Sequence, residues 1–155
     1  MRYFFVFQNK TFHAEQAGGY LWAPDGKFSH WKLMREVSKG DIIFHSYHRN
    51  IVAISRAESD CHPSPQPPEL AAEHLWDHNG LMVQCQYFVL PSALDTKSHI
   101  EELLKLQPQK YAPFNTSKRG NTGYLFNCSL EMATFLFDQL QKLNQNTPII
   151  ESIRP

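Results

Sequence analysis

The chain has few of the features that mark membrane, secreted or disulfide-bonded proteins. Its 155 residues contain no run of about eighteen apolar residues, so we expect no membrane span. The opening segment Met1–Phe7 is too short for the apolar part of a signal peptide and has no small-residue cleavage site. Three cysteines, odd in number and far apart, predict reduced thiols in a cytoplasmic protein.

Motifs for catalysis and metal binding are also missing. The sequence has no G-x-S-x-G, no P-loop and no G-x-G-x-x-G. Cys61, His74 and His78 have zinc-finger spacing, but no second cysteine pair precedes them and prolines intervene. We therefore expect no catalytic residue, no metal and no cofactor in this chain. A hydrolase with His45 as its acid–base group stays open as a minor alternative, although His45 has no obvious nucleophile beside it.

The charge is balanced in total but divided along the chain. Lys and Arg number 15, as do Asp and Glu, which argues against a protein that coats nucleic acid indiscriminately. Residues 1–56 and 103–155 carry an excess of cations, whereas residues 57–102 hold eight acids and one lysine. If the two basic segments meet, they form a cationic face suited to a local phosphate contact. The alternative is that these charges are solvated surface without a ligand.

Apolar runs and turn signals predict an α+β domain built on a small mixed sheet. Strands are expected at residues 3–7, 20–23, 42–44, 51–54, 81–90 and 124–126. Helices are expected at residues 29–37, 98–107 with a Ser98–Glu101 capping box, and 129–143 behind a Ser129 cap. Residues 45–50, 58–69 and 109–123 are expected to be loops. Because the early strands are hairpin-linked, a barrel-like sheet of about five or six strands is favoured over a βαβ fold. Residues 1–143 form one domain, and residues 144–155 a linker or tail.

Three tryptophans, Trp22, Trp31 and Trp76, lie in polar, turn-rich sequence and not in the apolar runs that build a core. A flat aromatic wall is how a protein holds a flat ligand, such as a nucleobase taken out of its stack. Trp22 and Trp76 are therefore candidate walls of a base pocket. Trp31 is equally well explained as a packing residue.

Polar side chains from other strand ends could meet the two indole rings at one rim. The candidates directly follow or precede a predicted strand and are His45, Ser46, Tyr47 and Asn121. Their amides and hydroxyls suit hydrogen bonds to the edge of a neutral heterocycle. The cations that would hold flanking phosphates are Lys10, Lys118 and Arg119.

The order of these motifs resembles the EVE domain of the PUA-like superfamily, a relative of YTH domains. The likeness is carried by Tyr3-Phe-Phe-Val-Phe-Gln-Asn-Lys10, Gly19-Tyr-Leu-Trp-Ala-Pro24, Gly40-Asp-Ile-Ile-Phe-His-Ser-Tyr47, Trp76 with Gly80, and Gly120-Asn-Thr-Gly-Tyr-Leu-Phe126. It covers nearly all of residues 1–143 and implies a PUA-like fold. It also implies base or backbone contacts for Gln8, Asn9 and Lys10. A further candidate for a contact with the base is Ala23, beside Trp22. A further candidate for a contact with the phosphate backbone is Arg49.

Members of this family commonly serve as the N-terminal reader of modification-dependent restriction endonucleases. The resemblance thus implies binding of double-stranded DNA and flipping of a cytosine that carries a 5-methyl or 5-hydroxymethyl group. No H-N-H motif is present, so the chain alone is not expected to be an enzyme. It would be the specificity domain of an HNH-type nuclease whose missing domain could form a homodimer. The alternatives are a YTH-like reader of methylated RNA and a protein-interaction module with exposed aromatic residues.

Overall fold

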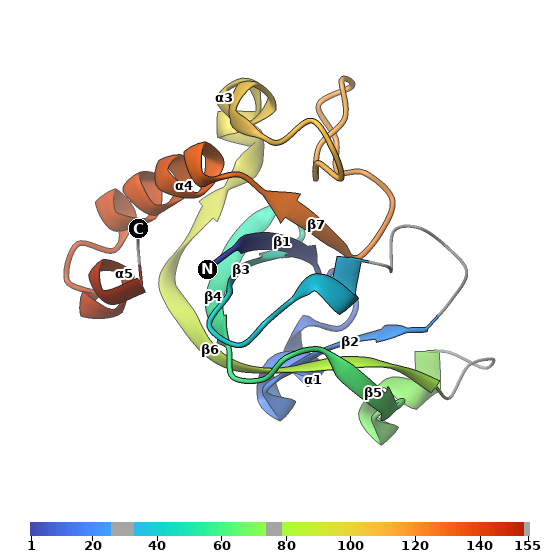
Figure 1. Cartoon of the computed structure of the whole chain (residues 1–155). Helices are drawn as coiled ribbons and strands as arrows, with labels where there is room; N and C mark the ends of the chain where they lie inside the picture. The colour runs from blue at the N-terminus through green and yellow to red at the C-terminus, as the bar shows by residue number, and fades with distance from the viewer. Residues whose placement is uncertain (26–32, 74–78, 154–155) are drawn as a thin grey trace.

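A computed structural model describes residues 1–25, 33–73 and 79–153. In these ranges seven strands form one curled mixed sheet, shown in Figure 1. The strands are β1 (Tyr3–Phe7), β2 (Tyr20–Pro24), β3 (Ile42–Tyr47), β4 (Asn50–Ala57), β5 (His62–Pro65), β6 (Asn79–Asp95) and β7 (Leu125–Cys128). Their order is β2-β6-β4-β3-β1-β7, and β5 also pairs with β6. Strands β1 and β3 run parallel, and the other pairs are antiparallel. The predicted fold class is confirmed.

Short helices flank the curled sheet. They are α1 (Phe12–Gly18), α3 (Ile100–Leu106), α4 (Leu130–Leu143) and α5 (Pro148–Ile153), with 3-10 turns η1 (Leu33–Glu36), η2 (Pro68–Glu73) and η3 (Thr96–His99). Helix α4 begins behind Ser129 as predicted, because the Ser129 Oγ accepts a hydrogen bond from the Met132 N–H at 3.2 Å. Within the described ranges, no helix has the length and apolar content needed to cross a membrane.

Two apolar clusters pack on opposite faces of the strands, because successive side chains of a strand point to opposite sides. One cluster contains Phe5, Phe44 and Phe137 and joins the sheet to α4 and α5. The other contains Phe4 and Ile43 and joins β1, β2, β3 and β6 across the curl. Burial on both faces explains why β1 is a continuous apolar run and does not alternate with polar residues.

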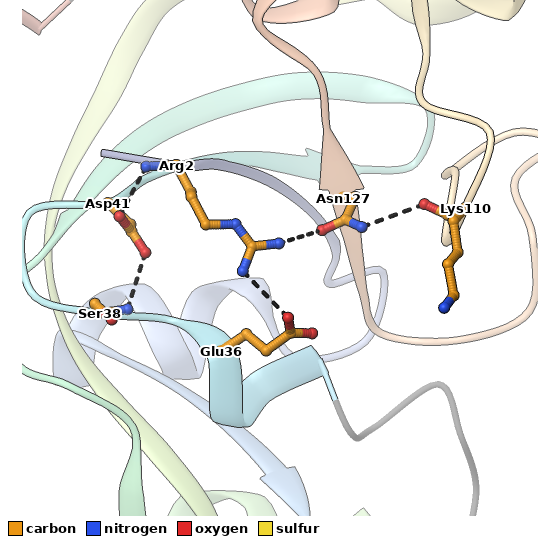
Figure 2. Close-up of polar contacts among 6 residues, drawn as sticks. All are labelled: Arg2, Glu36, Ser38, Asp41, Lys110 and Asn127. Carbon is orange, nitrogen blue, oxygen red and sulfur yellow. Dashed lines mark hydrogen bonds and ion pairs between the residues drawn. The ribbon is translucent and has the colours of Figure 1, made fainter.

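A polar cluster, drawn in Figure 2, ties the start of the chain to three other segments. The buried Asp41 carboxylate accepts hydrogen bonds from the backbone N–H groups of Arg2 and Ser38, each at 2.9 Å. The Arg2 guanidinium donates to Glu36 at 3.3 Å and to Asn127 at 3.0 Å. The first residues of β1 are therefore fixed between β3 and β7, and its far end leads into the site described below.

The hairpin between the third and fourth strands is tighter than the sequence suggests. Strand β3 continues to Tyr47 and β4 begins at Asn50, which leaves a two-residue turn at His48 and Arg49. His45, Ser46 and Tyr47 are strand residues and not loop residues. Their polarity misled the prediction, because pairing with β1 on one side and β4 on the other outweighs it.

Four further segments differ from the expectation. Residues 12–18, for which no element is predicted, form α1. Residues 62–65 were expected in a loop but form β5, where Pro63 and Pro65 are tolerated because the strand lies at a sheet edge. Residues 148–153, expected in a linker or tail, form α5, whose Ile150 and Ile153 are buried in the cluster beneath α4. The expected helix 29–37 lies partly outside the described residues, and its remainder forms η1.

Candidate functional site

A cavity of about 820 Å³ opens where the β3–β4 turn, η3 and the 113–123 loop meet. Five of the residues predicted to bind base or backbone line it, namely Asn9, Arg49, Lys118, Arg119 and Asn121. They come from three distant parts of the sequence, so the fold is what brings them together. The volume is that of a small-molecule or nucleotide pocket.

The cavity combines a cationic rim with apolar side chains. Its cations are Arg49, Lys97, Lys118 and Arg119, and no Asp or Glu is among the described residues that line it. Its apolar side chains are Phe7, Ile100 and Phe114. Lys118 Nζ lies 3.0 Å from Glu101 Oε1, but this ion pair is exposed and therefore contributes little stability. Such a site can hold an anion beside a flat apolar surface.

Sequence analysis missed Lys97, which η3 places at the cavity. Lys97 is the single Lys or Arg within the acidic segment 57–102, and that exception is the signal that could have revealed it. The Asp95 carboxylate caps η3 by accepting the Lys97 N–H at 3.0 Å and also accepts the Ser98 hydroxyl at 2.8 Å. The predicted Ser98–Glu101 capping box is therefore wrong, because Ser98 serves the preceding turn.

The turn that carries Arg49 is held in an unfavourable backbone conformation. His48 and Arg49 have φ angles of 48° and 69°, in the left-handed region that Asn-Gly usually fills in two-residue hairpins. Asn9 Oδ1 accepts the His48 N–H at 2.9 Å, so the predicted base-contacting amide of Asn9 holds the turn. The Arg49 carbonyl accepts both the N–H (3.0 Å) and the hydroxyl (2.8 Å) of Thr96. These three hydrogen bonds hold the backbone in its left-handed conformation, and the Arg49 side chain lines the cavity.

We expect Arg49→Gly to raise the free energy of unfolding by roughly 0.5–2 kcal/mol. Glycine relieves a left-handed strain of about 1–3 kcal/mol, and its greater freedom in the unfolded chain takes back about 0.5–1 kcal/mol. Arg49→Gln keeps the strained backbone and should leave stability unchanged. Urea denaturation of both variants and the parent measures the difference. Equal stability of the Gly and Gln variants would contradict the view that the turn is strained for the sake of its side chain.

The opposite wall of the cavity is the 113–123 loop, whose conformation is held by hydrogen bonds from its own asparagine side chains. Asn115 Oδ1 accepts the N–H groups of Ser117 (2.9 Å) and Arg119 (3.2 Å), which shapes the turn around Lys118. Asn121 Nδ2 donates to the Ala112 carbonyl at 2.8 Å. Asn121 therefore lines the cavity, as predicted, but its amide nitrogen supports the loop.

His45 and Gln8, both predicted to contact a base, lie inside the protein. His45 Nδ1 is 2.8 Å from Gln8 Oε1 and Nε2 is 2.7 Å from Ser55 Oγ. The Gln8 amide nitrogen donates to Glu15 at 2.8 Å and to Tyr87 at 3.1 Å. Burial lowers the pKa of His45 to about 3, so the ring is neutral near pH 7. These two side chains are parts of a buried network and not of the cavity wall.

Glu15, which sequence analysis missed because α1 was not predicted, is the centre of that network. Its carboxylate accepts hydrogen bonds from Thr11 at 2.7 Å, from the Trp22 backbone N–H at 2.8 Å, from Gln8 and from Tyr124. Burial raises the pKa of Glu15 to about 7, although these four bonds act in the opposite direction. Glu15 thus connects β2, which carries Trp22, to the residue that precedes β7.

Trp22 is 4% exposed, in a small cluster with Tyr20 and Leu70. Its Nε1 donates to the Ser64 carbonyl at 3.1 Å, and its ring lies so close to Gly80 that no larger residue fits there. This burial differs from the exposed wall expected from the polar flanking sequence, because β5 and η2 cover the ring. Trp76 and Trp31 lie outside the described residues.

The remaining predicted residues do not line the cavity. Ala23 and Ser46 are buried, and Ser46 Oγ has no hydrogen-bond partner among the described residues. Ser46 pairs with Phe7 in the parallel ladder, so both side chains leave the same face of the sheet. Tyr47 is half-buried, with its ring centroid 5.7 Å from that of Phe12, and Lys10 is exposed ahead of α1.

Comparisons with known proteins find likeness in structure and not in sequence. No protein-family model matches the chain, and no curated protein matches it. A protein from Leishmania major is similar with a TM-score of 0.62 and 9% identity over 92% of this chain and 96% of that one. Protein PSPTO5229 from Pseudomonas syringae gives 0.59 and 11% over 89% and 99%. The YTH domain of Zygosaccharomyces rouxii MRB1, solved in complex with N6-methyladenosine RNA, gives 0.52 and 9% over 90% and 86%. The chain therefore has a PUA-like fold, as its sequence resemblance implied, and this fold is shared with YTH domains.

Proposed function

We propose that the chain is a reader domain that binds nucleic acid containing a modified base. The phosphate backbone of that nucleic acid would lie on the rim of the cavity. The observation that carries the proposal is the convergence of Arg49, Lys97, Lys118 and Arg119 at one hollow free of lining acids. Cations in that arrangement suit phosphates, whereas a single exposed lysine does not. A fold shared with a YTH domain that was solved with modified RNA supports the same class of ligand.

In its finer form, the proposal is that the ligand is duplex DNA and the base a cytosine with a 5-methyl or 5-hydroxymethyl group. Trp22 and Trp76 are the predicted walls for the flipped base, which requires that β5 and η2 uncover the buried Trp22 ring. Stacking there is worth roughly 1–3 kcal/mol and offsets an unstacking cost of similar size. A buried methyl adds about 0.8 kcal/mol, so a methyl alone gives only a few-fold preference. The chain would act as the specificity domain of a modification-dependent nuclease, with catalysis in a joined HNH-type domain.

A second candidate, a reader of methylated single-stranded RNA, is favoured by the likeness to the YTH domain. In an A-form duplex the base edges are hard to reach, so such a reader takes bases from single strands. The cationic cavity serves either ligand equally, and only the base pocket distinguishes them. A protein-interaction module is the remaining alternative, and its binding would be far less sensitive to salt.

The decisive experiment is a binding panel in which the oligonucleotides differ only at one base. It comprises duplex DNA with cytosine, 5-methylcytosine or 5-hydroxymethylcytosine, and single-stranded RNA with adenine or N6-methyladenine, at one fixed salt concentration. We expect one modified oligonucleotide to bind several-fold more tightly than its plain partner. Salt-dependent binding with no preference for any modification would refute the reader proposal and leave a plain nucleic-acid binder.

The role of Trp22 is tested by a matched pair of substitutions in its cluster. Trp22→Ala and Leu70→Ala both empty the same small cluster, at about 3–5 and 2–5 kcal/mol respectively, so both should lower stability. If Trp22 stacks on the base, its loss should also remove the ratio of modified to plain affinity, whereas Leu70→Ala should keep that ratio. Equal ratios in the two variants would make Trp22 a packing residue only.

A further inference from the structure

A second hollow lies beside the cavity, on the other side of the 113–123 loop. It is an open groove of about 1150 Å³ between the end of α3, the 107–116 segment and Phe126 of β7. Three loop residues line both hollows, namely Phe114, Asn121 and Thr122. One wall therefore separates the two, and a ligand long enough to cross that wall would occupy both.

The groove presents an aromatic ring on a fixed backbone. Tyr111 is 38% exposed and lines the groove with a φ of 57°, a conformation that is costly for a bulky residue. Its carbonyl accepts the Asn127 N–H at 2.8 Å, and the carbonyl of Lys110 accepts Asn127 Nδ2 at 3.2 Å, as Figure 2 shows for the latter. The next carbonyl, of Ala112, is held by Asn121. The strain is thus maintained on both sides of Tyr111, while its ring is left half-open to solvent.

The chemistry of the groove matches that of a single nucleotide. Lys105 lines it, and no acid is among the described lining residues. Lys110 Nζ lies over one face of the Tyr111 ring, 5.4 Å from its centre, so a base would stack on the other face. Gln109 and Thr116 supply an amide and a hydroxyl for the edge of a base. An exposed ring next to a cation is a sequence-tolerant stacking platform, because every base has a π-face.

We propose that this groove binds a neighbouring nucleotide of a single-stranded segment, with its base stacked on Tyr111 and its phosphate at Lys105 and Lys110. The strand passes over the wall from the cationic cavity into the groove. This inference rests on the proposed function, which supplies the nucleic acid, and extends it to a second nucleotide subsite. It favours the single-stranded candidate ligand over duplex DNA, because the partner strand of a duplex would cover the stacking face next to the modified base.

The test uses Tyr111→Gly, with Tyr111→Phe as the matched control, on the whole chain. Glycine relieves the left-handed φ, which offsets the packing lost with the half-exposed ring, so we expect this variant to fold. A single-stranded oligonucleotide of about nine nucleotides should bind the Gly variant about 5- to 100-fold more weakly, the range expected for one lost base stack. The Phe variant should bind as the parent does, and a mononucleotide should bind all three proteins alike.

A fluorescent base analogue next to the modified base provides an independent reading. Its emission should be quenched on binding to the parent and the Phe variant, and not on binding to Tyr111→Gly. Unchanged affinity of the nine-nucleotide ligand for the Gly variant would overturn the subsite and leave the proposed function standing. Absence of any nucleic-acid binding by the parent chain would overturn both.

Discussion

A chain with Arg49, Lys118 and Arg119 all replaced by glutamine should bind its nucleic-acid ligand about 10²- to 10³-fold more weakly at 0.1 M salt. The reason is counterion release, in which each neutralised phosphate adds about 0.9 on duplex DNA, or about 0.7 on a single strand, to the slope of log affinity against log salt. Three lost contacts should therefore lower the magnitude of that slope by roughly 2 to 3. Stability should change little, because these side chains lie at the rim and the Lys118–Glu101 ion pair is exposed.

The matched control removes the same charge elsewhere. Lys39, Arg56 and Lys142 lie outside the residues that line the cavity and the neighbouring groove. Their replacement by glutamine should reduce affinity only slightly, through the net charge of the chain. Titrations of each variant at three salt concentrations give both affinity and slope. If both triple variants lose affinity equally, binding is governed by total charge and the cavity is not the phosphate site.

The loss should also be uniform between modified and plain ligands. Contacts to phosphate fix position and carry no information about the base, so the affinity ratio of the two ligands should stay constant as absolute affinity falls. A selective loss of the modified ligand would place one of these cations, Arg49, Lys118 or Arg119, next to the base instead. That outcome would move the base pocket into the cavity, whose apolar Phe7 and Phe114 could then take the place proposed for Trp22.

The fold was predictable wherever a local signal agrees with the tertiary structure. Continuous apolar runs gave β1 and the centres of β3, β4 and β6, and the Ser129 cap with its apolar periodicity gave α4. Elements that depend on pairing with, or packing against, distant segments were not predicted. Strand β5 has prolines that oppose strand formation and exists because one edge of β6 is open to it. Helix α5 is short and follows polar sequence, so it depends on its contacts with the core and with α4.

The candidate site was predictable in three of its four cations, Arg49, Lys118 and Arg119, but not in Lys97 or in the buried polar network. Lys118, Arg119 and Asn121 lie in a glycine-bounded turn where exposure follows from composition, and they do line the cavity. His45 follows Ile42-Ile-Phe44, so its polarity looked like the start of a loop. In a sheet buried on both faces, a polar residue can continue the strand if buried hydrogen-bond partners are present. Gln8 and Ser55 are such partners for His45. Sequence spacing alone does not reveal partners from the residue after β1 and from β4.

The neutral state of His45 is fixed by its neighbours. The Gln8 amide nitrogen donates to Glu15, so Gln8 Oε1 faces Nδ1, which must carry the proton. Nε2 then accepts the Ser55 hydroxyl. The Tyr87 ring lies 4.3 Å from the imidazole, between ring centres, and the Tyr87 hydroxyl donates to the Tyr20 carbonyl. Burial lowers the pKa of His45 from its ordinary 6.5 to about 3. Folding therefore excludes the charged ring.

Since the pKa of His45 is depressed in the folded state, its contribution to stability is complete above pH 6.5 and is lost as pH falls towards 3. That loss reaches about 4–5 kcal/mol if the whole shift is expressed. Glu15 acts in the opposite sense, because its raised pKa of about 7 gives a contribution that is present below pH 4.5 and lost as pH rises through 7. Between pH 4.5 and 6.5 the two slopes oppose each other, so the parent chain should show a nearly flat stability profile there.

His45→Gln should separate the two slopes, because glutamine keeps a donor and an acceptor but cannot titrate. The variant should be about 1–3 kcal/mol less stable than the parent at pH 7, through imperfect replacement of two buried hydrogen bonds. Its free energy of unfolding should then rise as pH falls from 7 to 4.5, as Glu15 alone would dictate. His13→Gln, at an exposed histidine, is the control for a histidine-to-glutamine change outside the buried network. Urea denaturation across pH 3.5–8 measures all three proteins, and a His45→Gln curve parallel to that of the parent would show that the imidazole accepts a proton in place.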